Sequence, residues 1–305
     1  MRAFFCPHAS VAKKTMNWQQ VHITIPKESL EELEAFLLSI GALTVTYKDA
    51  GDNPVLEPLP GETPLWPELN VTGLFDQKKN MNTVMNILNR HYPDLNIIKE
   101  EFEDQDWERS WMQDYQPMSF GSRLWVVPTN MQAPDKNAIN LRLDPGLAFG
   151  TGTHPTTSLC LQWLDQHDVS GLTLLDYGCG SGILAIAGLL LGVSIAEGVD
   201  IDPQAITASQ DNASNNRVGD KLNVYLPDDY QPKQYDIVMA NILSGPLAEL
   251  APDLSSYTKS GGEIILSGIL SEQAESIRTV YQQWFDMKPV IIDDGWAMLS
   301  GRKKL

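Results

Sequence analysis

The sequence predicts an α/β protein in which a small antiparallel βαββαβ domain precedes a larger, mostly parallel sheet with helices on both faces. The chain has 305 residues, enough for two domains of about 150 residues each. Strand and helix patterns follow the order βαββαβ up to residue 102 and alternate regularly after Thr156. Hydrophobic residues make up 43% of the chain and charged residues 20%, a composition that excludes extensive disorder.

The charge of the chain excludes several classes of function. The sequence has 22 basic and 39 acidic residues, which give a formal net charge of −17. Phosphate backbones and anionic membranes repel a protein of this charge, so we expect neither stable nucleic-acid binding nor membrane binding. A basic partner is the natural expectation.

The cysteines and the apolar runs indicate the compartment. Cys6, Cys160 and Cys179 are odd in number and lack CxxC spacing, so neither a disulfide framework nor a zinc site is predicted. The longest nearly apolar run, Gly182–Val193, is shorter than the roughly 20 residues of a membrane span. The short apolar patch near the N-terminus does not resemble a signal-peptide core. We therefore expect a cytoplasmic protein with no metal centre.

Residues 1–15 precede the first predicted strand and contain three basic residues and no acid. We interpret this segment as a disordered leader that follows a start codon assigned too early. A short basic arm is the alternative.

Residues 16–102 have the pattern of a ferredoxin-like domain. In the first predicted helix an apolar residue returns every three or four positions, and Gly41 follows as its C-terminal cap. Five prolines between residues 49 and 68 indicate a surface loop. The predicted elements are strand Val21–Ile25, helix Lys27–Ile40, strand Leu43–Tyr47, strand Leu69–Phe75, helix Met81–His91 and strand Leu95–Lys99.

A linker helix is predicted over residues 103–120. Trp107, Trp111 and Tyr115 recur every four residues with acids between them, as on the apolar side of a short amphipathic helix. Two strand-like segments, Arg123–Val127 and Ala138–Leu143, come next. We therefore place the second domain at residues 121–305.

A glycine loop follows the first strand of the regularly alternating part. Leu172–Leu175 is an apolar strand, Asp176 ends it, and a helix begins at Ile183. The alternating glycines between them are Gly178, Gly180 and Gly182. Such glycines let a ligand approach the backbone closely. The dinucleotide fingerprint GxGxxG would place its third glycine at Ile183 or Ala185, whereas D/E-x-G-x-G-x-G, the pattern of S-adenosylmethionine enzymes, matches throughout.

Two polar residues follow other strands of this sheet. Asp200 comes directly after a strand that ends at Val199, a position from which a carboxylate accepts hydrogen bonds from ribose hydroxyls. Asp200 could instead cap the next helix, but Asp202 precedes a proline and fits that cap better. Asn241 ends strand Tyr235–Ala240, opposite the glycine loop, where its amide can bind cofactor or substrate.

The segment Leu143–Thr157 is dense in glycine and threonine and contains one aromatic residue. Ordinary turn chemistry explains only a few of these residues. We interpret the segment as a flexible lid whose ring and hydroxyls pack on a bound nucleoside. The candidate cofactor-binding residues within it are Phe149, Gly150 and Thr151.

Four motifs, LDPGLAFGTGTHPTT, DYGCGSGILAIA, GVDIDPQAI and ANIL, occur in this order. With the preceding βαββαβ domain they resemble the bacterial ribosomal protein L-eleven methyltransferase family, PrmA, over residues 16–305. The resemblance implies a class I methyltransferase (Rossmann-like) sheet that binds S-adenosylmethionine, behind a ferredoxin-like domain that recognises the ribosomal protein. It points to Thr157, Gly178, Asp200 and Asn241 as cofactor-binding residues, with Asn241 also as the candidate catalytic residue. It further implies methylation of lysine side chains and an N-terminal amine, with repeated transfer.

The reaction requires a neutral amine aligned with the C–S bond of the donor. Deprotonating a lysine amine at pH 7 costs roughly 4.6 kcal/mol. His154 is a weak candidate for the base, and we expect desolvation and the sulfonium charge to lower the amine pKa instead. After Asn241 the sequence lacks the proline pair and aromatic residue that hold planar nitrogens in related enzymes.

These residues predict a protein methyltransferase that acts on aliphatic amines of ribosomal protein L-eleven. A methyltransferase for another protein or a small amine is one alternative. A nucleoside-binding module without transfer activity and a nucleotide-dependent oxidoreductase are the others.

Overall fold

The computed structural model describes residues 17–51, 66–103, 115–144, 150 and 152–305. They belong to two compact units, which we describe separately. Several predictions fall outside the described residues: the leader, most of the proline-rich loop, the helix at 104–114, and the lid residues Phe149 and Thr151. Within the described ranges, no helix is long and apolar enough to cross a bilayer.

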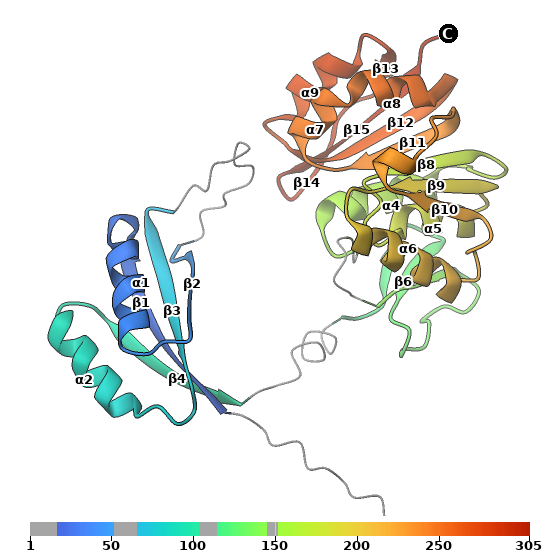
Figure 1. The fold of residues 1–305 in the computed structure, drawn as a ribbon. Coiled ribbons are helices and arrows are strands. Elements are labelled where there is room, and N and C mark those ends of the chain that lie inside the picture. The colour runs from blue at the N-terminus through green and yellow to red at the C-terminus, as the bar shows by residue number, and fades with distance from the viewer. Residues whose placement is uncertain (1–16, 52–65, 104–114, 145–149, 151) are drawn as a thin grey trace, which may run out of the picture. The chain divides into compact units, whose positions relative to one another are not determined.

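The first unit is a four-stranded antiparallel sheet with two helices (Figure 1). Its strand order, β2-β3-β1-β4, is that of the ferredoxin-like plait, which confirms the predicted βαββαβ arrangement. The first helix is shorter than predicted, because a 3-10 turn at Lys27–Ser29 precedes it. The elements are β1 (Asn17–Pro26), α1 (Leu30–Ser39), β2 (Thr44–Asp49), β3 (Glu68–Phe75), α2 (Met81–His91) and β4 (Ile97–Glu103).

The two faces of this sheet differ in chemistry. Alternate residues of β1, namely Val21, Ile23 and Ile25, are buried in one core with apolar residues of α1 and α2. On the opposite face His22 bonds to the Thr72 hydroxyl (2.9 Å) and to the carboxylate of Glu100 (3.0 Å). The alternation of β1 is therefore that of a strand whose second face is not covered by the helices.

The second unit is built on an eight-stranded sheet with the path β10-β9-β8-β11-β12-β15-β13, and β14 pairs with β15 beside it. The five strands along the path from β10 through β9, β8 and β11 to β12 run parallel to one another. Strand β15 runs antiparallel to its neighbours. The strands are β8 (Thr173–Tyr177), β9 (Ile195–Val199), β10 (Leu222–Tyr225), β11 (Tyr235–Asn241), β12 (Thr258–Leu270), β13 (Phe285–Met287), β14 (Ile291–Asp293) and β15 (Trp296–Lys303).

Helices cover both faces of this sheet (Figure 1). Successive residues of β8, Leu174 and Leu175, are buried in different cores, as are Ile237 and Val238 of β11. Such strands have no polar face, which explains their nearly continuous apolar sequence. One core contains α4 (Pro155–Gln166), α5 (Ile183–Leu190) and α6 (Pro203–Asn215), and the other contains α7 (Ser244–Glu249), α8 (Ala251–Tyr257) and α9 (Ala274–Tyr281).

A small three-stranded sheet precedes α4. It consists of β5 (Met118–Phe120), β6 (Leu124–Val127) and β7 (Ile139–Arg142). The linker helix was predicted to reach residue 120, but residues 118–120 form the strand β5. Pro117 gives the reason, because the residue before a proline disfavours the helical conformation and a helix therefore ends there. The buried carboxylate of Asp165 in α4 accepts hydrogen bonds from the backbone N–H groups of Ser122, Arg123 and Leu124, each at 2.8 Å. These bonds fix α4 to the small sheet.

Candidate active site

The described residues among those predicted to bind the cofactor gather around the carboxyl ends of β8, β9 and β11. The chain proceeds from β8 outward through β9 and β10, and from β11 outward in the other direction through β12. Ligands of doubly wound sheets bind where the strand order reverses in this way. The predicted glycine loop follows β8, and Asn241 is the last residue of β11.

The glycine loop requires glycine for its backbone conformation. Gly178, Gly180 and Gly182 all have positive φ, at 81°, 52° and 76°. A Cβ atom on Gly178 would lie only 2.2 Å from Cγ2 of Ile242, in the turn after β11. Gly178 therefore lets the two strand ends approach one another.

Ile242 meets a second glycine from the opposite direction. Gly268 in β12 has φ +83°, and a Cβ on it would lie 2.3 Å from the carbonyl oxygen of Ile242. The turn after β11 is thus packed between two positions at which even a methyl group would clash with Ile242. This packing fixes the backbone from which Asn241 extends.

Asp200 holds the glycine loop and its own turn together. Its Oδ2 accepts from the N–H of Gly180 (2.8 Å), and its Oδ1 accepts from the N–H of Asp202 (3.0 Å). Asp202 caps α6 through the N–H of Gln204 (2.8 Å), as predicted, so Asp200 is not the cap. Each carboxylate oxygen of Asp200 keeps acceptor capacity for a further hydrogen bond.

Ile201 is a feature that the sequence analysis missed. It directly follows Asp200 and is 84% exposed, although it is a large apolar residue. The sequence did contain a signal for this exposure: Ile201 lies between two aspartates in a loop and belongs to no periodic apolar pattern. A bound nucleoside at this strand end could cover it.

Asn241 and Thr157 meet although 84 positions separate them. Thr157 is almost fully buried in the first turn of α4, and its hydroxyl accepts a hydrogen bond from Nδ2 of Asn241 at 3.2 Å. The other amide atom, Oδ1 of Asn241, is buried and has no hydrogen-bond partner among the described residues. The bond to Thr157 therefore directs an unsatisfied acceptor away from α4.

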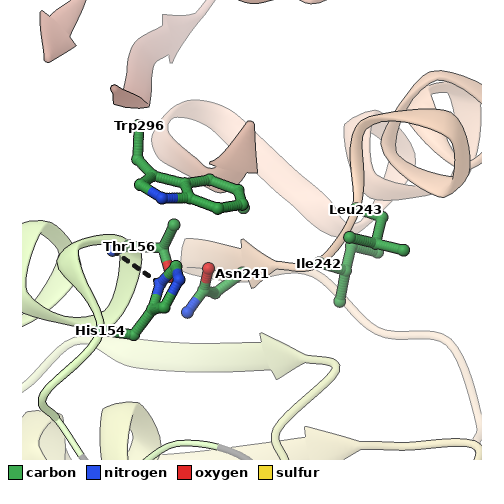
Figure 2. A pocket seen from close by; sticks show the side chains of 7 residues that line it. His154, Thr156, Asn241, Ile242, Leu243 and Trp296 are labelled. Atoms are coloured by element: carbon green, nitrogen blue, oxygen red, sulfur yellow. Dashed lines mark hydrogen bonds between the residues drawn. The ribbon is translucent and has the colours of Figure 1, made fainter. Parts of the chain in front are cut away.

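A cavity of about 360 Å³ opens beside this amide (Figure 2). None of its described lining residues carries a carboxylate or an ammonium group. Figure 2 shows the oxygen of Asn241 on the side of the Trp296 ring, with Ile242 and Leu243 beyond the end of β11. The lining residues are His154, Thr156, Asn241, Ile242, Leu243, Gly268 and Trp296.

His154 caps α4 from within this lining. Its Nδ1 accepts from the backbone N–H of Thr156 (3.3 Å) and bonds to the hydroxyl of the same residue (2.8 Å). Burial lowers the pKa of His154, partly offset by the charge of Asp294. With Nδ1 engaged in capping and its pKa lowered, this imidazole is a poor base for the reaction.

Asp176 is completely buried at the end of β8. Its Oδ2 accepts from the N–H of Ala185 (3.2 Å), while Oδ1 has no partner among the described residues. Burial raises the pKa of Asp176 to about 7, despite the bond from Ala185, and the charge of Asp200 adds to the increase. The strand was predicted to stop before Asp176 but continues to Tyr177.

Gly150 is one of the residues of the predicted lid that the structure describes. It has φ +99°, and its carbonyl oxygen accepts a hydrogen bond from the hydroxyl of Ser181 at 2.6 Å. The segment before α4 is thereby tied to the glycine loop. Ser181 is a second residue that the sequence analysis did not single out.

The model of the ribosomal protein L11 methyltransferase (PrmA) family matches residues 17–304. The chain belongs to this family. It is 53% identical over 294 residues to ribosomal protein L11 methyltransferases of Escherichia coli O81 (strain ED1a) and Shigella boydii serotype 18, covering 94% of this chain and 100% of each relative. A solved ribosomal protein L11 methylase from Lactobacillus delbrueckii subsp. bulgaricus has a TM-score of 0.57 and 33% identity, covering 63% of this chain and all of that one.

Membership in the L11 methyltransferase family identifies the fold class of each unit. The second unit is the Rossmann-like sheet of a class I methyltransferase, and the first is the ferredoxin-like domain that the sequence predicted. Enzymes of this family take the methyl group from S-adenosylmethionine, as the glycine pattern indicated.

Replacement of Gly178 by alanine tests the close approach to Ile242. Gly171 also has positive φ (+74°), but a Cβ there meets nothing within 4 Å, so Gly171→Ala reproduces the backbone strain without the clash. We expect Gly178→Ala to lower the free energy of unfolding by about 2 kcal/mol more than Gly171→Ala. Denaturant unfolding of both variants measures this difference, and equal losses would contradict the packing argument.

Asp176→Asn should change how stability depends on pH. The folded carboxyl pKa, about 7, lies above the ordinary value of 3.8, so the wild type loses stability as pH rises between these values. Asparagine does not titrate. The variant should therefore gain stability relative to the wild type as pH rises from about 4 to about 7, by at most about 4 kcal/mol at 1.36 kcal/mol per pKa unit. Thermal unfolding without methyl donor measures this, and parallel pH curves would show that Asp176 is ionised when folded.

Proposed function

We propose that this enzyme transfers methyl groups from S-adenosylmethionine to lysine side-chain and N-terminal amines of ribosomal protein L11. Its relatives, named ribosomal protein L11 methyltransferase, match over their whole length. One observation at the site carries the proposal. The buried Oδ1 of Asn241 has no hydrogen-bond partner among the described residues, and it lies beside a cavity whose described lining contains no carboxylate or ammonium group. An acceptor in such surroundings favours an uncharged N–H donor.

The residues at the strand ends fit S-adenosylmethionine. We assign cofactor binding to the glycine loop, to Asp200 as acceptor for the ribose hydroxyls, and to the exposed face of Ile201 against the adenine ring. Bound S-adenosylmethionine supplies a methyl group on a positively charged sulfur. The proposed cofactor-binding residues are Phe149, Gly150, Thr151, Thr157, Gly178, Gly180, Asp200 and Asn241.

Asn241 is the proposed catalytic residue because it can hold the amine nitrogen. Its Oδ1 accepts one N–H of a neutral amine, and this hydrogen bond directs the nitrogen lone pair. Thr157 prevents the amide from rotating by accepting from Nδ2. Since burial lowers the pKa of His154, the lining favours the neutral form of the amine rather than its ammonium form.

The charge of the chain supports a basic protein substrate. A net charge of −17 attracts a lysine-rich partner and raises its rate of encounter. We propose residues 16–102 as the recognition domain, residues 103–120 as the connection between the domains and residues 121–305 as the catalytic domain. A cytoplasmic location follows from the proposed substrate, and repulsion from ribosomal RNA favours methylation of free L11 over the assembled ribosome.

The direct test is mass spectrometry of purified L11 after incubation with the enzyme and S-adenosylmethionine. We expect mass increases of about 14 Da per methyl group on lysine residues and the N-terminus. A mixture of all large-subunit proteins in the same experiment reveals whether another protein is the substrate. Donor binding by calorimetry without any labelled protein would instead indicate a binding module.

Asp200→Ala should weaken binding of the methyl donor. Loss of two hydrogen bonds to a charged acceptor costs about 3 kcal/mol, which corresponds to an affinity lower by roughly two orders of magnitude. Asp202→Ala is the matched control, since it removes a helix cap worth about 1 kcal/mol two positions away. Calorimetry should show weakened binding for the first variant only. Unchanged affinity in Asp200→Ala would remove the ribose assignment.

Thr157→Val should slow methyl transfer because it frees the Asn241 amide to rotate. Valine keeps the shape of threonine but lacks the acceptor, so we expect a rate on the order of tenfold lower, with Thr157→Ser close to the wild type. In a double-mutant cycle, adding Thr157→Val to Asn241→Ala should cause little further loss. Additive losses would mean that the two residues act independently.

A further inference from the structure

Successive methylation removes the N–H groups that Asn241 can bind. In each transfer the nitrogen lone pair forms the new N–C bond, the electron pair of the C–S bond stays on sulfur, and the ammonium product releases a proton to water before the next transfer. A neutral primary amine has two N–H groups, a monomethylamine has one and a dimethylamine has none. The dimethylamine that receives the third methyl group therefore cannot donate a hydrogen bond to Oδ1 of Asn241. Other contacts must hold that amine.

Trp296 is placed to provide those contacts. It lines the same cavity as Asn241, and the amide oxygen lies on the side of the indole ring (Figure 2). Ile242 and Leu243 add apolar surface, and no described lining residue offers a carboxylate to a methylated ammonium group. An aromatic face attracts a methylated cation, and it also offers apolar packing to the methyl groups of a neutral dimethylamine.

The indole is held in position by its surroundings. Trp296 is the first residue of β15, where it pairs with Asp293 of β14 and with Leu270 of β12. Asp294 and Gly295 between β14 and β15 both have positive φ, at 46° and 78°, as in a type I′ hairpin turn. The ring of His154 packs edge-on against Trp296, with centroids 4.8 Å apart and an interplanar angle of 69°. The aromatic face is therefore a fixed wall of the cavity.

We propose that Trp296 determines how many methyl groups one amine receives, by retaining the mono- and dimethylated amine for the later transfers. This inference rests on the proposed function, because it requires an amine substrate at Asn241. Asn241 orients the primary amine mainly through hydrogen bonding, and Trp296 holds the dimethylamine through contacts with its ring. The ratio of products, more than the overall rate, reports this division of roles.

The test compares Trp296→Leu and Trp296→Phe with the wild type, using free L11 and S-adenosylmethionine, with products resolved by mass spectrometry over time. Leucine keeps an apolar side chain but removes the ring, so we expect the third transfer to slow at least tenfold relative to the first, with mono- and dimethylated products accumulating. Phenylalanine should restore most of the trimethylated product. Trp284→Leu is the matched control, since Trp284 packs against the core that contains α7, α8 and α9 and is not among the residues that line the cavity.

Thermal unfolding and donor binding by calorimetry establish that each variant is folded. Three outcomes would overturn the inference: an unchanged product ratio in Trp296→Leu, an equal slowing of all three transfers, or a wild type that stops after one methyl group. Failure of the proposed function is distinguishable, because the wild type would then leave L11 unmethylated altogether. Trimethylation by the wild type with an unaltered Trp296→Leu profile removes the inference alone.

Discussion

The site depends on how closely the turn after β11 approaches its neighbours. Ile242 lies between Gly178 and Gly268, and a Cβ on either glycine would come within about 2.3 Å of it. Interiors packed this densely transmit the position of one backbone segment to the next. The glycine loop, β12 at Gly268 and the end of β11 are therefore one rigid assembly, and Asn241 extends from it.

Around that assembly, hydrogen bonds satisfy several polar atoms but leave the buried Oδ1 of Asn241 without a partner among the described residues. Asp200 joins the glycine loop to its own turn, and Thr157 occupies one half of the Asn241 amide. Only the oxygen half of that amide has no partner among the described residues. Since an unsatisfied buried acceptor costs free energy, a bound N–H donor recovers that cost, which is how a stable fold can favour one ligand chemistry.

Charge is distributed differently at the surface and at the proposed reaction centre. The chain as a whole is strongly acidic, which suits encounter with a basic protein. The described lining of the cavity has no acid, and its histidine has a lowered pKa. A carboxylate there would stabilise the ammonium form of a lysine, which has no lone pair to react. Long-range attraction and a neutral pocket are thus compatible because solvent and ions screen the surface charges over about 10 Å.

The sequence by itself determined the elements and the local chemistry. Period-2 and period-3.6 patterns predicted the βαββαβ order and the alternating half, and the glycine spacing and the cap at Asp202 are local signals that need no partner. The placement of Gly178, Asp200 and Asn241 at one sheet edge also followed, since parallel strands end together. Only the tertiary structure decided the orientation of the Asn241 amide, the wall formed by Trp296 and the exposure of Ile201. Each of these arises from contacts between residues far apart in the chain, such as Thr157 and Asn241, and no local pattern encodes which side chains will meet.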